Sequence, residues 1–356
     1  MSRTRFLVSA AAGLVALAFS GTAFAAYTPS LLVAGTNHAL GGSGPVVIGL
    51  GQNENDDATA VATIYSPPGY KVALTQPAGT TLGSLSGVFK VAALGGARVN
   101  IEGTVKTDNP ANYVSNPCSP GVHEAVWVLE FTLSGTVTRV PMYVDRVTTA
   151  PENAFASARM RICFPSPYIP PPQGANSGAA LIVAAFAIRG VFTNPGAKGP
   201  YPWNGVFVPY TPGTGTVNAA NSAQSTSFVR LPMRLTMTAK RQRIRGSKRT
   251  FAVVTACATE AGQGIRGLTV NFRGAATATA ANRLNAPKVA SGRTNARGCV
   301  TRRIPVKRKS LYARALVDVP ARLAPGCQPT IVPRCTEASV APGFDLSSGR
   351  PKRVRR

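Results

Sequence analysis

Short runs of alternating apolar and polar residues, separated by Gly, Pro and Asn, follow one another along most of this chain. Such runs are typical of β-strands joined by turns, and helical periodicity is scarce after the first residues. In the first part of the chain the pattern predicts strands at 45–51, 58–66, 71–76, 88–94, 97–106, 124–135, 138–148, 157–164, 181–192 and 204–210. Strands at this spacing, without intervening helices, predict an antiparallel β-sandwich or a pair of small ones.

Alternation resumes at residue 230. Leu235, Met237 and Ala239 are predicted to face a core, with polar neighbours facing outward, and similar patterns occupy 251–260, 267–272 and 311–319. The span 230–322 is close to the roughly 100 residues of an immunoglobulin-like sandwich. The fold prediction is therefore all-β, with two antiparallel β-sandwich regions.

The predicted domain organisation follows from these patterns. The polar, small-residue segment 211–229 has no strand pattern, so we interpret it as a linker. The predicted parts are a signal peptide at 1–25, a β-sandwich at 26–210, the linker at 211–229, an immunoglobulin-like sandwich at 230–322 and a basic, cysteine-containing tail at 323–356.

The stretch SGRTNARGCVTRRIPV (291–306) resembles the Thr-Asp-x-x-Gly hairpin turn and following strand of bacterial immunoglobulin-like and carboxypeptidase-regulatory-like domains. Thr294, Asn295 and Gly298 occupy the turn positions, with Asn295 in place of the usual Asp, and a long insertion at 273–290 departs from the pattern. The resemblance implies a non-catalytic spacer or adhesion module of secreted surface proteins. Asn and Gly both tolerate positive φ, which is a second reason to predict a hairpin turn.

The first 25 residues have the three parts of a secretory signal peptide. Arg3 and Arg5 precede an apolar run of 14 residues (Phe6–Phe19), and Ala23-Phe24-Ala25 supplies the small residues of a cleavage site. The longest later apolar run, Ala179–Ile188, is half of the roughly 20 residues that a membrane-spanning helix needs. We therefore predict an exported protein, extracellular or at the cell envelope, with no transmembrane segment after cleavage.

Charge divides the chain. Residues 26–229 hold 10 Lys and Arg against 9 Asp and Glu, whereas residues 230–356 hold 27 against 4. The basic residues gather in the groups 240–249, 302–309 and 350–356, and such clusters attract polyanions. Because export removes the usual nucleic-acid target and no aromatics interleave with the basic residues, the predicted partners are anionic cell-envelope polymers or glycans, not nucleic acid. The alternative is that the charge serves solubility alone. The predicted polyanion-binding residues are Arg241, Arg243, Arg245, Lys248, Arg249, Lys307, Arg308 and Lys309.

An aromatic group in the segment 199–213 offers an alternative function. Tyr201, Trp203 and Tyr210 could form an exposed row that stacks on sugar rings, as in a carbohydrate-binding module. The same residues could equally fill the core beside the last predicted strand.

Six cysteines in an exported chain indicate disulfides, with 15 pairings open. The cysteines are Cys118, Cys163, Cys257, Cys299, Cys327 and Cys335. The simplest pairing joins neighbours within each part: Cys118 with Cys163, Cys257 with Cys299, and Cys327 with Cys335. No Cys-x-x-Cys pair occurs, so we predict no zinc site.

Motifs for chemistry are nearly absent. The chain has two histidines, and HEAVW at 123–127 lacks the second His of a zinc helix. GSLSG at 83–87 misses the spacing of a hydrolase nucleophile turn. The acidic turn 53–57 could hold calcium or simply be solvated. We therefore predict no enzyme, no catalytic residues, no metal and no cofactor.

Overall fold

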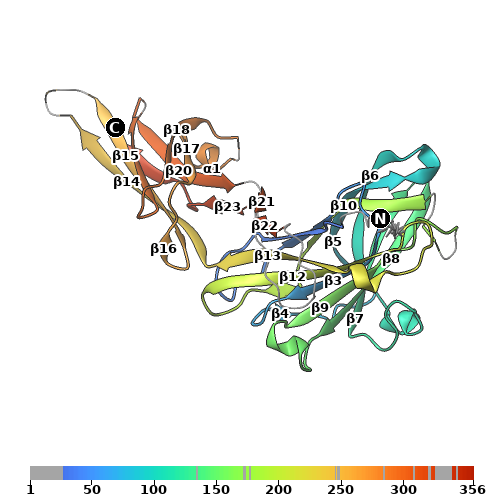
Figure 1. Ribbon diagram of the computed structural model, residues 1–356. Coiled ribbons are helices and arrows are strands. Elements are labelled where there is room, and N and C mark those ends of the chain that lie inside the picture. Colours follow the sequence, from blue (N-terminus) through green and yellow to red (C-terminus); the bar gives the residue numbers. More distant parts are fainter. Residues whose placement is uncertain are drawn as a thin grey trace, which may run out of the picture.

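The computed structural model describes residues 27–356 except 134, 171–173, 176–177, 245, 247–248, 284, 308, 320–321, 325–338 and 342–343. The predicted signal peptide, Cys327 and Cys335 lie outside the described residues. Almost all regular structure in the described part is β-strand in antiparallel sheets, which confirms the all-β prediction. Figure 1 shows two units, a large rolled sheet and a smaller sandwich beyond it.

The first unit is built on one large sheet, in the order β1-β2-β10-β5-β6-β7-β8-β9-β3-β12-β13-β22-β21. The strands in chain order are β1 (Ser30–Gly35), β2 (Val46–Gly51), β3 (Thr59–Ser66), β5 (Thr81–Val91), β6 (Ala97–Asp108), β7 (Ala125–Leu133), β8 (Thr136–Arg146), β9 (Ala158–Cys163), β10 (Ala179–Ile188), β12 (Gly199–Pro209), β13 (Ala223–Leu231), β21 (Arg322–Ala324) and β22 (Ser339–Ala341). A separate ribbon pairs β4 (Lys71–Val72) with β11 (Phe192–Thr193). Short 3-10 turns occur at η1 (Ala92–Leu94), η2 (Pro110–Tyr113), η3 (Glu152–Ala154) and η5 (Ala219–Asn221).

The large sheet rolls over until β1, at one edge, lies beside β13. The backbone N–H of Leu31 donates to the hydroxyl of Ser225 at 3.0 Å, and that of Val33 donates to Ser227 at 2.9 Å. Serine hydroxyls on β13 therefore satisfy the N–H groups of β1 that point away from β2. This contact closes the roll around the main apolar core of the unit.

The core of the first unit is filled by alternate side chains of the strands. Its largest fully buried members include Trp127, Trp203, Phe186 and Phe192. The apolar run at 179–188 is strand β10, which directs Phe186 and other alternate residues inward. In the described part of the chain, no helix has the length and apolar character needed to cross a membrane.

A disulfide fastens the long β6–β7 connection of this unit. Cys118 is bonded to Cys163 at the end of β9, with their Cα atoms 6.2 Å apart. The pairing predicted for these two cysteines is confirmed, and so is the pairing of Cys257 with Cys299 in the second unit. The third predicted pair lies outside the described residues.

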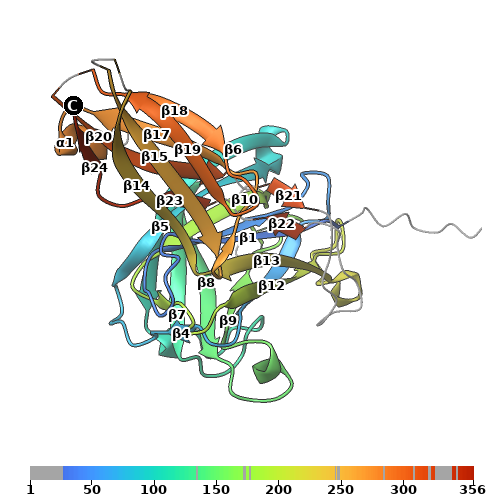
Figure 2. The same ribbon diagram turned by 90° about the vertical axis from the view of Figure 1, so that its left-hand side faces the viewer.

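The second unit is a sandwich of two antiparallel sheets. One sheet contains β14 (Met233–Arg243), β15 (Thr250–Glu260), β16 (Gln263–Gly264) and β19 (Cys299–Pro305). The other contains β17 (Thr269–Ala275), β18 (Lys288–Arg293), β20 (Ser310–Val319), β23 (Phe344–Ser347) and β24 (Lys352–Arg355). The short helix α1 (Ala278–Asn282) lies in the 273–290 insertion, and Figure 2 shows β14, β15 and β19 running along the length of this unit.

The inward series predicted for the second unit is confirmed. Leu235 and Met237 are buried, and Ala239 packs against the same core, which also contains Phe272 and Val317. The polar residues that alternate with this series on β14 are exposed.

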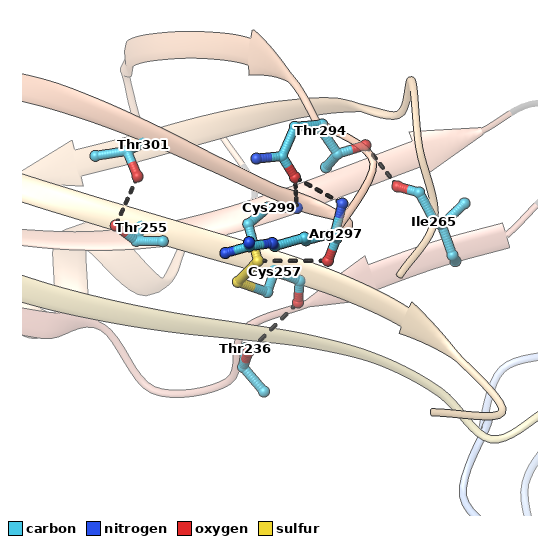
Figure 3. The surroundings of a disulfide bond; sticks show 9 residues. Thr236, Thr255, Cys257, Ile265, Thr294, Arg297, Cys299 and Thr301 are labelled. Carbon is cyan, nitrogen blue, oxygen red and sulfur yellow. Dashed lines mark hydrogen bonds between the residues drawn. A yellow bond between two sulfur atoms is a disulfide. The ribbon is translucent and has the colours of Figure 1, made fainter. Parts of the chain in front are cut away.

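The turn predicted as a hairpin joins the two sheets instead. The preceding strand, β18, pairs with β17, whereas the following strand, β19, pairs with β15. Figure 3 shows Thr294 donating to the carbonyl of Ile265, at 2.6 Å. Gly298 adopts a φ of 75°, and the Asn295 side chain accepts from the N–H of Cys299 at 3.1 Å. The hairpin prediction was wrong because the turn residues fix a bend but do not determine which strands pair.

Two predicted boundaries also need correction. Part of the segment predicted as a linker forms β13, which pairs with β12 along its length. Two of its serines are buried, and their hydroxyls accept hydrogen bonds from the backbone of β1. The linker prediction was wrong here because these hydrogen bonds allow a polar sequence to form a buried strand. The predicted tail contributes β23 and β24, which both pair with β20, and β22, which pairs with β13.

Candidate polyanion-binding site

The β14–β15 hairpin carries basic residues past the core of the second unit. Pairing continues to Arg243 and Thr250 at its end. Arg241 and Arg243 continue the inward-facing series that includes Ala239, yet both side chains are exposed. The hairpin therefore projects beyond the apolar core, and both of its faces present charge to solvent.

The β19–β20 connection reaches the same end of the sandwich. The N–H of Val306 donates to the carbonyl of Thr250 at 2.9 Å. Val306 is buried, whereas Lys307 and Lys309, which follow it, are exposed. The buried valine thus anchors a basic turn beside the basic hairpin.

The last strand brings a third basic segment to this place. Ser310 pairs with Arg355 across β20 and β24, and the N–H of Arg356 donates to the carbonyl of Lys309 at 3.0 Å. Val354 is 3% exposed and holds β24 against the core. In Figure 1 the C-terminal end lies close to the β14–β15 hairpin, at the end of the second unit away from the rolled sheet.

We call this group of side chains the basic tip. It consists of Arg241, Arg243, Arg249, Lys307, Lys309, Arg355 and Arg356, all of which are exposed. Apart from Arg249, none of them is within 4.0 Å of a carboxylate oxygen of the described residues. The positive charge of these six residues is therefore not neutralised by a described carboxylate and is available to a partner.

The acidic residues described in the second unit lie at its opposite end. Glu260 ends β15 next to the first unit and pairs with Arg230 at 3.1 Å. Asp318 lies opposite Asp345 near the far end of β20 from Ser310. Exposed basic residues such as Arg234, Arg266 and Arg297 also lie at that end, so the basic tip is distinguished by having no described Asp or Glu among its members. Like charges gathered without a counter-charge produce a positive field that attracts polyanions. Salt screens such a field over about 8 Å at physiological ionic strength.

The structure brings most of the predicted polyanion-binding residues together. The five predicted residues that it describes all belong to the basic tip: Arg241, Arg243, Arg249, Lys307 and Lys309. Arg245, Lys248 and Arg308 lie outside the described residues. Arg355 and Arg356 are not among the predicted polyanion-binding residues, because the pattern of 323–356 predicts a tail and not a strand of the sandwich. The one sequence signal for this strand is Val354, an apolar residue between basic ones, which is the alternation of a short strand. In the structure Val354 is buried and the flanking arginines are exposed.

The aromatic residues considered for sugar binding do not form an exposed row. Trp203 is fully buried, with ring centroids 5.1 Å from Tyr70 and 5.3 Å from Phe192. Tyr210 is 8% exposed, and its hydroxyl donates to a backbone carbonyl at 2.6 Å. Tyr201 is half-buried against the same core. The prediction of a sugar-stacking platform is wrong, because the alternating pattern of β12 directs Trp203 inward.

Burial also dominates the titration of this cluster. Desolvation raises the pKa of the Tyr70 phenol to about 12, and it raises the pKa of Tyr201 and Tyr210 above the ordinary value. These phenols therefore stay neutral near neutral pH and act as packing groups with one polar end.

His123 has a structural position in the loop fastened by the Cys118–Cys163 disulfide. Its Nδ1 lies 3.0 Å from a carboxylate oxygen of Asp145, and its Nε2 lies 3.0 Å from the carbonyl oxygen of Ser119. The ring is 7% exposed and packs on Tyr143, with centroids 4.6 Å apart. Both nitrogens are thus engaged in holding the loop on the sheet.

The acidic turn at 53–57 is also occupied by internal contacts. A carboxylate oxygen of Asp56 accepts from the N–H and the hydroxyl of Thr28, each at 2.7 Å. Glu54 pairs with Arg98 at 2.6 Å. Burial and the neighbouring Asp56 raise the pKa of Asp57. Within the described residues, no three His, Cys, Asp or Glu side chains are grouped as metal ligands would be.

The GSLSG motif lies within strand β5.

Comparison of the chain with protein-family models, curated proteins and solved structures gave no match. The resemblance to immunoglobulin-like and carboxypeptidase-regulatory-like domains therefore stays a prediction.

Proposed function

We propose that this protein is an exported, non-enzymatic interaction protein that attaches to anionic polymers of the cell envelope through the basic tip. One observation carries the proposal. Three basic segments far apart in the sequence converge at one end of the second unit, and the acidic residues described in that unit lie at the other end. Cations brought together without a described carboxylate among them produce a positive field that attracts a polyanion.

The expected binding mode is electrostatic. An anionic polymer that contacts several Lys and Arg side chains releases its condensed counterions, so affinity falls steeply as salt rises. The first unit has a net charge of only +1 over residues 26–229 and contributes little to this attraction. In the proposed role it is the part displayed by the attached protein.

Co-sedimentation with isolated cell envelopes across a salt series tests the proposal. The test variant carries Arg241→Gln, Arg243→Gln and Lys307→Gln in the basic tip. The matched control carries Lys71→Gln, Arg189→Gln and Lys198→Gln, which are exposed positions of the first unit with the same loss of charge.

The wild type and the control should sediment at low salt and be released at high salt, whereas the tip variant should stay largely in solution. Equal loss of binding in both variants would show that total charge matters and the tip does not. Salt-resistant binding by all three proteins would also contradict the proposal.

A further inference from the structure

Three cationic side chains lie in one row across adjacent strands of the second unit. Lys288 on β18 pairs with Arg273 on β17, and Arg273 pairs in turn with Arg314 on β20. Directly paired residues of antiparallel strands direct their side chains to the same face of the sheet, with Cβ atoms about 5 Å apart. Phe272 and Ala315, the chain neighbours of the two arginines, belong to the core, so the row lies on the outer face. Like charges opposite each other destabilise a sheet.

This row runs from solvent into the interior. Lys288 is exposed, Arg273 is half-buried, and Arg314 is only 6% exposed. The short helix α1 contacts both β17 and β20, and Figure 1 shows it beside these strands. The insertion at 273–290 therefore covers the Arg314 end of the row and leaves the Lys288 end open.

Both guanidinium groups bond only to neutral oxygens of that insertion. Arg314 donates to the side-chain oxygen of Asn282 at 3.2 Å and to the carbonyl oxygen of Arg283 at 2.9 Å. Arg273 donates through Nη1 to the carbonyl oxygen of Ala286 at 2.8 Å. In both arginines Nε is buried and hydrogen-bonds to no described residue. The hydrogen-bonding capacity of the two groups is thus only partly used.

The positive charge of the row is not offset by the described part of the chain. None of its carboxylate oxygens lies within 4.0 Å of a nitrogen of Lys288, Arg273 or Arg314. An arginine stays protonated in proteins, so the repulsion cannot be relieved by loss of a proton. A buried charge without a counter-charge costs free energy. An anion bound to the row would remove this cost.

The row fits a phosphate group. The second terminal nitrogen of Arg273, Nη2, hydrogen-bonds to no described residue and, unlike Nε, is not excluded from solvent. An oxyanion that contacts this nitrogen and the ammonium of Lys288 approaches from the open end, with the charge of Arg314 behind it. A phosphate group carries a charge of about −1.5 to −2 near neutral pH and several acceptor oxygens, which suits three cations better than a carboxylate does.

We propose that Lys288, Arg273 and Arg314 bind one phosphate group on the outer face of β18, β17 and β20. None of the three belongs to the basic tip, so binding here does not depend on the proposed function. Inorganic phosphate and the end group of a phosphorylated polymer present the same chemistry.

Isothermal titration of the full chain with inorganic phosphate, at constant ionic strength, tests the site. The wild type should bind with one site per chain. Arg273→Gln and Arg314→Gln should each weaken the affinity by about 10-fold or more, since each removes a charged group from the row. Arg234→Gln is the matched control, because this exposed arginine of the same unit carries the same charge, and it should change the affinity by at most about 2-fold.

Calorimetry distinguishes binding from a purely structural role of the arginines. Phosphate at about 20 times its Kd, exchanged for chloride at equal ionic strength, should raise the unfolding temperature of the wild-type second unit by about 5 °C or more. Arg234→Gln should show the same rise, and Arg273→Gln should show little of it. Circular dichroism establishes that each variant is folded. Arg273→Gln changes a half-buried position, so it supplies the test if Arg314→Gln does not fold.

Three results would overturn the phosphate site. They are no phosphate binding by the wild type, equal affinities in the wild type and Arg273→Gln, or equal losses in Arg273→Gln and Arg234→Gln. The basic-tip variant should keep its phosphate affinity, and loss of binding in that variant alone would assign phosphate to the tip and contradict the site. Competition with glycerol phosphate then distinguishes the two sources. Displacement would support the end group of a polymer as the occupant, and no displacement would support inorganic phosphate.

Discussion

Replacing Trp203 by Ala tests whether the aromatic segment at 199–213 is core or binding surface. The side chain is fully buried in the first unit and makes edge contacts with Tyr70 and Phe192. A tryptophan buries on the order of 200 Å², which at about 25 cal/mol per Å² corresponds to roughly 5 kcal/mol. Measured Trp→Ala changes in cores cost about 3–5 kcal/mol, and we expect a loss in that range.

The assay is urea unfolding followed by the fluorescence of Trp127. This residue is the other of the two tryptophans of the chain and lies in the same core, so its signal reports the first unit. The midpoint should fall strongly for Trp203→Ala, while Tyr201→Ala, at a half-buried position, should cost about 1–2 kcal/mol. A loss below about 1 kcal/mol for Trp203→Ala would refute the reasoning, since a buried side chain of this size cannot be removed so cheaply.

Three further predictions concern stability. Replacing Cys118 and Cys163 by Ser opens a loop with a sequence separation of 45 residues, which should lower the free energy of unfolding in urea by about 4 kcal/mol. A change near zero would contradict the role given to this disulfide. Gly298→Ala should lower the calorimetric unfolding temperature of the second unit, because the residue has a φ of 75° and a Cβ there would lie 2.3 Å from the Ala258 carbonyl oxygen; an unchanged temperature would mean that this turn has another geometry. Burial lowers the pKa of His38 below 6.5, so the unfolded chain binds the proton first and stability should fall as pH drops below about 6.5 towards the folded pKa. Between pH 7.5 and 5.5 the urea midpoint of the His38→Asn variant should fall less than that of the wild type. Equal falls in the two proteins would contradict the assignment of this pH dependence to His38.

The strands of the second unit were predictable because their alternation is strict. Leu235 and Met237 alternate with exposed polar residues, and period-two burial is the direct consequence of strand geometry. The disulfides within each unit followed from the simple expectation that cysteines pair with neighbours. Both inferences depend on local or near-local information, which a single sequence contains.

Elements that depend on a distant partner could not be predicted in this way. Strand β13 has a polar sequence, and its serines make sense only once β1, almost 200 residues earlier in the chain, lies beside it. The last strand has four residues with one buried valine, too short a pattern to separate from a basic tail. Trp203 was ambiguous because an aromatic residue on a strand has the same sequence signature whether it faces a core or a ligand. The convergence of the basic groups likewise depends on which strands pair.

Lysine footprinting with soluble polyphosphate tests the central claim most directly. The full chain is acetylated briefly with and without polyphosphate at low salt, and each lysine is followed by mass spectrometry. Lys307 and Lys309 of the basic tip should become protected, whereas the exposed Lys71 and Lys198 of the first unit should react as before. Raising the salt should remove the protection, since the attraction is electrostatic. Equal protection of all four lysines, or protection confined to the first unit, would contradict the assignment of polyanion binding to the basic tip.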